Sequence, residues 1–364
     1  MQVVILERNK LVGRKVARLF MATGASAVTV EDPAGVAAHL GGAQVLCADT
    51  FDGDLVAEQT RARPGLQGVL WTAEPLRRSL RYLVETATID SRDATRGGVT
   101  GPALPGQSSI DGKSPLAIDP RDATRGGVNG PALPGHSPIG GKSPLPINHV
   151  LGRRDFESPP RAWEVTMLAR RLAGVPAPSL GAYLDWGYTA LDLEVRTTAD
   201  RDAAAAKIQD FIGALAVPRR IAEMFAELGH ELIMNAMYDA PVDAHGRPKY
   251  AADRKAEIVL AEHERPGVRL ATDGSRLALQ IRDPFGRLER RHVFDGLARG
   301  LAGGELDRSG GGAGLGMMVC HNASTAMFFD VVPNQKTEVT AVFELDLNLR
   351  EFRTSAKSLH FWRH

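Results

Sequence analysis

The sequence is poor in cysteine and in net charge, and it lacks long apolar runs. Cys47 and Cys320 are the only cysteines among 364 residues, which excludes a disulfide framework or a cysteine-based metal site. The formal net charge of +1 offers no overall field for nucleic acid or a membrane surface. No apolar run approaches the ~18 residues of a membrane span, and residues 1–7 are too short an apolar run for a signal peptide. We therefore expect a cytoplasmic protein with no nucleic-acid or membrane partner.

Hydrophobic residues, in contrast, make up 43% of the chain, which is ample for folded cores. At roughly 100–200 residues per domain, the length predicts two domains. Residues 1–87 alternate strands with helices, a pattern that favours a parallel, doubly wound sheet. The strands are expected at Val3–Leu6, Ala27–Val30, Gln44–Ala48 and Gly68–Trp71. The helices are expected at Leu11–Met21, Pro33–Leu40 and Leu76–Val84.

Three polar residues follow strands of this predicted sheet, at the carboxyl edge where such sheets gather their chemistry. Glu7, Asp49 and Thr72 come after the first, third and fourth strands. This arrangement resembles a response-regulator receiver domain. The resemblance implies that Asp49 accepts a phosphoryl group, that Glu7 helps to hold Mg²⁺ and that Thr72 senses the phosphoryl group. The alternative is a receiver-shaped interaction domain. The family's lysine after the fifth strand has no clear match, because Gly152-Arg153-Arg154 follows the candidate strand Ile147–Leu151.

An insertion at residues 88–147 separates the fourth strand from the fifth. Residues 90–118 recur almost unchanged as residues 119–147, and both copies are rich in Gly, Pro and Ser. This composition cannot bury a core, so we expect disorder. The receiver-like region resumes with its last strand at 148–157, and a helical linker follows at 158–180. The linker's helix either connects the domains, packs between them or pairs with a second chain.

Residues 181–346 begin with a strand and a helix, and a longer helix then opens at Pro218. On this second helix Glu227, Glu231, Asn235 and Asp239 stand four residues apart and share a face. A solvated acidic face is the ordinary interpretation of this spacing. Asn235 favours a site instead, because asparagine is a poor helix former unless its amide is used.

Two further motifs follow along the chain. The predicted strand Leu277–Ile281 delivers Asp283 and, shortly after it, Gly286. Residues 287–309 look mobile, and a glycine cluster at 310–316 then runs into an apolar helix. The N–H groups at such a helix start bind phosphate. A predicted strand at Ile258–Leu260 and a closing hairpin at Ala326–Val331 and Glu338–Leu345 complete the region.

The order Glu-x-x-x-Asn, Asp-x-x-Gly and Gly-x-Gly-Leu-Gly resembles the GHKL ATPases, and most closely their anti-sigma-factor serine kinases. The resemblance implies an α/β sandwich that binds ATP and Mg²⁺. Glu231 would be the general base and Asn235 would hold Mg²⁺. Asp283 would bind the adenine amino group, with Gly286 beneath the base and Thr337 assisting nearby. The residues expected to wrap the phosphates are Gly312, Gly314, Leu315 and Gly316.

The expected fold is therefore α/β with two domains: a receiver-like sheet interrupted by a disordered insertion, then a GHKL-type domain at 181–346. Residues 347–364 are expected to form a basic, aromatic tail. The two resemblances imply a signalling protein that acts as a protein Ser/Thr kinase or a slow ATPase. Two alternatives stay open: a nucleotide-gated interaction protein without catalysis, and a phosphorelay regulator with a degenerate ATPase domain. The expected partner is a kinase substrate, a sigma-factor-like regulator or an antagonist, with a homodimer as a further alternative.

Overall fold

The computed structural model describes residues 1–84, 147–302 and 313–364. These residues build one mixed α/β unit around an eleven-stranded sheet, in the order β2-β1-β3-β4-β5-β11-β9-β10-β8-β7-β6. The predicted insertion, up to residue 146, and the start of the glycine cluster lie outside the described residues. Within the described ranges, no helix has the length and apolar character needed to cross a membrane.

The N-terminal half contains five parallel strands, as the alternating pattern predicts. Their spatial order, β2-β1-β3-β4-β5, is that of flavodoxin-like doubly wound sheets. All the carboxyl ends therefore meet at one edge of the sheet. The strands are β1 (Gln2–Leu6), β2 (Ser26–Val30), β3 (Val45–Asp49), β4 (Gln67–Thr72) and β5 (Ile147–Gly152).

Helices cover this part of the sheet through their apolar faces. In α1 (Lys10–Met21), Asn9 caps the start and Val16 and Phe20 are buried against the sheet. The linker helix α4 (Ala162–Leu172) joins the same core through Leu168. Two further helices are α2 (Gly53–Ala62), which the sequence pattern did not indicate, and the short α3 (Leu76–Leu80). The short helix expected from Pro33 is a 3-10 helix, η1 (Pro33–His39).

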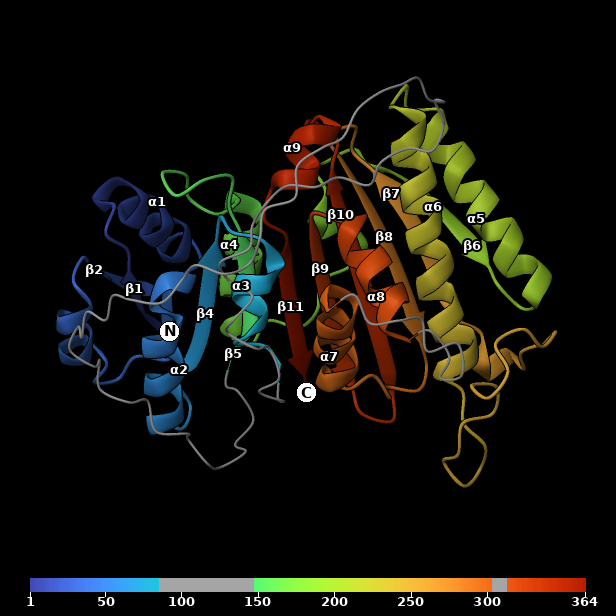
Figure 1. Cartoon of the computed structure of the whole chain (residues 1–364), viewed down its shortest axis with the longest axis horizontal. Helices are drawn as coiled ribbons and strands as arrows, with labels where there is room; N and C mark the ends of the chain where they lie inside the picture. Colours follow the sequence, from blue (N-terminus) through green and yellow to red (C-terminus); the bar gives the residue numbers. More distant parts are fainter. Residues whose placement is uncertain (85–146, 303–312) are drawn as a thin grey trace, which may run out of the picture. The chain divides into compact units, whose positions relative to one another are not determined.

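The C-terminal half is built on antiparallel strands. They are β6 (Thr189–Glu194), β7 (Gly267–Thr272), β8 (Arg276–Asp283), β9 (Ala326–Val332) and β10 (Lys336–Glu344). Four helices lie across one face of these strands (Figure 1). They are α5 (Thr198–Gly213), α6 (Arg219–Met234), α7 (Arg290–Leu301) and α8 (Ala313–Asn322). This layering places the end of α6, the end of β8 and the start of β10 around one cavity.

Two expectations for this half differ from the structure. The segment Ile258–Leu260 is not a strand, because only Val259 pairs, in an isolated bridge to Thr197. The segment expected to be mobile contains α7, which is ordered because Val293, Phe294 and Leu297 are fully buried. The apolar residues of this segment have helical spacing. The arginines around them made the segment resemble an exposed loop.

The C-terminal residues do not form a separate tail. They fold as α9 (Leu349–Thr354) and then β11 (Ser358–Arg363), which pairs antiparallel with β5 and parallel with β9. Leu359, His360 and Phe361 are buried in this strand. β11 therefore makes the sheet continuous, and the described strands of both halves belong to one sheet.

Candidate functional site

One cavity in the C-terminal half gathers residues from the motif-bearing elements. Its volume is about 350 Å³, which is in the range of small-molecule sites. Three predicted residues line it: Asn235 after α6, Asp283 at the end of β8 and Thr337 on β10. Thr337 stands directly opposite Asp283 in the register of the two strands. The apolar part of the wall includes Leu232, Ile281, Met317, Phe329 and Val339.

Asp283 is a buried carboxylate in this wall, with 7% of its surface exposed. Its Oδ1 accepts hydrogen bonds from the backbone N–H groups of Phe285 at 2.9 Å and Gly286 at 3.3 Å. Burial raises the pKa of Asp283, and these backbone hydrogen bonds act in the opposite direction. The carboxylate is thus fixed by its own turn, and it lines a cavity in which a ligand's N–H donor would find an acceptor.

Gly286 has a structural reason to be glycine. Its φ of 65° lies in the left-handed region. A Cβ at this position would stand 2.0 Å from the carbonyl oxygen of Val332, the last residue of β9, and 2.9 Å from the backbone nitrogen of Asn334 in the turn to β10. Gly286 therefore packs against that turn and does not itself line the cavity.

The motif helix changes its winding at the predicted metal ligand. Helix α6 ends at Met234 and continues as a π-helix, η5 (Asn235–Asp239). Single π turns occur often at functional sites. The change brings Asn235 and Asp239 together on the cavity wall. The four-residue spacing predicted the shared face but not the π turn, because the winding depends on how the segment packs.

The predicted general base lies against the glycine-rich helix start. A Cβ on Gly316 would stand 2.3 Å from the Glu231 carboxylate oxygen Oε2, so a larger residue here would displace this carboxylate. Leu315, in the same turn of α8, is exposed. Gly314 lies within α8, and Gly312 lies outside the described residues. Glu231 itself is not among the residues that line the cavity.

A set of basic residues in the cavity was not anticipated from the sequence. Arg254, Arg287 and Arg299 all line it, together with His292. The Arg254 guanidinium donates to Asn235 Oδ1 at 3.2 Å and forms an ion pair with Asp239. Arg287 Nη1 is buried and has no hydrogen-bond partner among the described residues. The only sequence signal was the presence of arginines in segments that looked like loops.

The contacts of Arg254 involve the oxygens that would bind a magnesium ion. Mg²⁺ prefers several oxygen ligands in near-octahedral geometry. Here one guanidinium already holds the oxygens of both Asn235 and Asp239. The described parts of the chain also contain no group of three His, Cys, Asp or Glu residues placed to hold a metal. In this structure the oxygens at which magnesium is predicted are therefore held by the guanidinium of Arg254.

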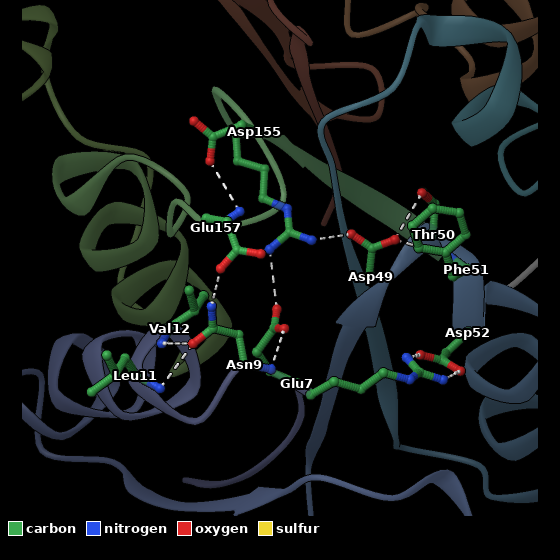
Figure 2. Close-up of polar contacts among 12 residues, drawn as sticks. Glu7, Asn9, Leu11, Val12, Asp49, Thr50, Phe51, Asp52, Asp155 and Glu157 are labelled. Carbon is green, nitrogen blue, oxygen red and sulfur yellow. Dashed lines mark hydrogen bonds and ion pairs between the residues drawn. The ribbon is translucent and has the colours of Figure 1, made fainter.

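The second predicted site, at the carboxyl edge of the N-terminal sheet, is an ion-pair cluster. Arg153, which follows β5 and is 3% exposed, contacts two carboxylates. Figure 2 shows these two side chains, Glu7 and Asp49, near one another. Its Nη1 is 3.1 Å from Glu7 Oε2 and its Nη2 is 2.6 Å from Asp49 Oδ2. Asp49 Oδ1 also accepts from the backbone N–H of Phe51 at 2.9 Å. The structure thus brings Glu7 and Asp49 together, as predicted, but around a side-chain cation.

Thr72 lies close by and is hydrogen-bonded within the protein. Its hydroxyl accepts from Thr50 Oγ1 at 3.2 Å and from the backbone N–H of Glu74 at 2.9 Å. The loop after Arg153 covers the cluster: the ring of Phe156 packs 5.3 Å from that of Phe51. The acidic cluster is therefore closed by the segment that follows β5.

Comparison with known proteins does not place the chain in a family. No family model matches it, and no curated protein does. Among solved structures, the chain is similar to a chain in the crystal structure of the SiaB–SiaC complex from Pseudomonas aeruginosa, at 11% sequence identity and a TM-score of 0.26. The similarity covers 43% of this chain and 88% of the other.

Proposed function

We propose that the chain binds ATP in the cavity of its C-terminal half. The observation that carries this proposal is the meeting of Asn235, Asp283 and Thr337, from three separate elements, on one cavity wall. Asp283 offers a buried acceptor for an amino group, and the arginines offer donors for phosphate oxygens. The contact of Glu231 with Gly316 further supports a GHKL-type arrangement, in which a carboxylate lies beside the phosphate loop.

We propose further that this ATP-binding region serves signalling, with the receiver-like half as its control region. If phosphate is transferred to a protein Ser or Thr, or to water, Glu231 is the proposed general base. Magnesium at Asn235 stays a prediction, and its binding there requires Arg254 to release the same oxygen. The proposed partner is a signalling protein.

A second candidate function is a nucleotide-gated interaction protein without catalysis. The contacts of Arg153 favour it for the N-terminal half, because they occupy the two carboxylates that would bind Mg²⁺ and accept a phosphoryl group. Phosphorylation of Asp49 stays a prediction, and acyl phosphate labelling of the whole chain tests it.

A pair of aspartate variants tests the binding proposal. Asp283→Asn changes the buried acceptor, and Asp192→Asn removes an exposed carboxylate of β6 outside the cavity. We expect saturable binding of ATP and of adenosine by the native chain and by Asp192→Asn. Asp283→Asn should weaken both ligands by roughly tenfold or more, which is the effect of a hydrogen bond to a charged group. Native chain that is folded but binds neither ligand contradicts the proposal.

Catalysis is tested separately by Glu231→Gln. If Glu231 is the base, the variant keeps ATP binding and loses transfer of labelled phosphate to protein or water. Transfer at the native rate excludes that role. No transfer by the native chain, with binding intact, favours the interaction protein.

A further inference from the structure

We propose that Arg254, and not a divalent metal, provides the positive charge that holds a nucleotide's phosphates in the cavity. This inference rests on the proposed function and names the chemistry of its ligand: an adenine nucleotide whose phosphates bind without Mg²⁺. Arg254 comes from the loop between η5 and β7, and it was not part of any motif in the sequence.

The position of Arg254 carries the inference. Its Nη2 donates to Asn235 Oδ1 at 3.2 Å, and its Nε donates to Asp239 Oδ1 at 3.2 Å. A guanidinium therefore sits where two oxygens converge on the cavity wall, which is where a metal ion would be placed. A planar guanidinium also matches phosphate oxygens, because it can donate two parallel hydrogen bonds.

A second observation points to an anion in the same cavity. Arg287 Nη1 is buried without a hydrogen-bond partner among the described residues, although its side chain lines the cavity. A buried donor without an acceptor is costly, so native proteins normally satisfy it. Phosphate oxygens would satisfy it here. Arg299 lines the same space and adds a third positive charge.

Asp239 competes with the phosphates for Arg254. The two form an ion pair within the cavity wall, yet burial raises the pKa of Asp239 in spite of that partner. The environment of Asp239 therefore disfavours the charged form of its carboxyl group. When a polyphosphate enters, its oxygens would replace the carboxylate as acceptors for Arg254. Removing the charge of Asp239 should consequently strengthen the binding of phosphates.

The test measures affinities of the whole chain for ATP, AMP and adenosine, each in magnesium and in EDTA. The variants are Arg254→Gln, Asp239→Asn and a matched control, Arg269→Gln, in which the arginine lies on β7 outside the cavity. Circular dichroism and thermal unfolding confirm that each variant is folded. Adenosine serves as the ligand without phosphate.

We expect ATP affinity to be the same in magnesium and in EDTA. Arg254→Gln should weaken ATP binding by roughly tenfold or more, because it removes charged hydrogen bonds to the phosphates. The affinity for adenosine, which has no phosphate, should stay unchanged. Asp239→Asn should strengthen ATP by about threefold or more, through loss of the competing charge. Arg269→Gln should change neither ligand.

Two results overturn the inference and leave nucleotide binding intact. One is ATP affinity that falls tenfold or more in EDTA, as metal-bridged phosphates require. The other is Asp239→Asn weakening ATP while adenosine binds normally, which would identify Asp239 as a ligand of a metal rather than a competitor. Absence of both ATP and adenosine binding by the folded native chain would instead overturn the proposed function.

Discussion

Replacing Arg153 by methionine is predicted to destabilise the protein strongly. The guanidinium contacts Glu7 and Asp49, and the side chains of all three residues are at most 7% exposed. Methionine keeps much of the side-chain volume but leaves two carboxylates buried together without a cation. Breaking a buried ion pair by removing one partner costs about 3–5 kcal/mol. Backbone N–H groups still bond both carboxylates, at Asn9 and Phe51, so we expect about 3 kcal/mol.

The matched control breaks an exposed ion pair in the same region. Lys10 pairs with Glu31, and more than half of each side chain is exposed. Lys10→Met should therefore cost less than about 1 kcal/mol. A triple variant, Glu7→Gln with Asp49→Asn and Arg153→Met, removes all three charges at once. It should recover most of the lost stability, because replacement of a whole buried ion cluster is often close to neutral.

Urea unfolding near neutral pH, followed by circular dichroism with and without MgCl₂, measures these differences. In Arg153→Met the two freed carboxylates can hold a hard cation, so magnesium should restore part of the stability by binding the folded state. Magnesium should not stabilise the native chain at this cluster. A loss below about 1 kcal/mol for Arg153→Met would show that the cluster does not hold β5 to β1 and β3. An equally unstable triple variant would show that packing, and not charge, dominates.

Two further predictions concern the C-terminal half. Gly316→Ala would bring a methyl group 2.3 Å from Glu231 Oε2, so the carboxylate must move away, and the gain of about 0.4–1 kcal/mol normal for Gly→Ala in a helix should be lost in urea unfolding. Gly213→Ala, where an added Cβ meets nothing within 4 Å, should show that gain, and an equal gain in both variants contradicts the contact. Burial lowers the pKa of Lys357 to about 6. The unfolded lysine titrates near 10.5, so it binds more protons than the folded one between these values, and stability should rise with pH in this window. The slope should reach at most about 1.4 kcal/mol per pH unit. Lys357→Met should flatten the slope, and an unchanged slope refutes the assignment.

The parallel sheet was predictable from the sequence because its strands are short, apolar and regularly interrupted. Val3–Leu6 and Gly68–Trp71 are buried on both faces, which gives continuous apolar runs. The position of β11 was not predictable. Its residues look like a basic, aromatic tail, and their burial depends on pairing with β5, which lies 206 residues away in the chain at the Gly152–Ser358 contact.

In the candidate site, too, some residues could be predicted from the sequence and others could not. Asn235, Asp283 and Thr337 could be placed together because each belongs to a motif on a recognisable element. Arg254 could not, because it follows irregular backbone whose path is set by tertiary packing. Arg153 directly follows the predicted fifth strand, but the sequence did not indicate that its guanidinium contacts both Glu7 and Asp49. In both places an arginine contacts the oxygens of a predicted magnesium site. Spacing along the sequence identifies the acidic and amide side chains but not the cation that neutralises them.

Calorimetric titration of ATP onto the native chain and onto Asp283→Asn tests the central claim most directly. Saturable binding by the native chain, weakened roughly tenfold or more in the variant, is the expected result. The same affinity in both proteins, or no binding by folded native chain, contradicts an ATP site at this cavity.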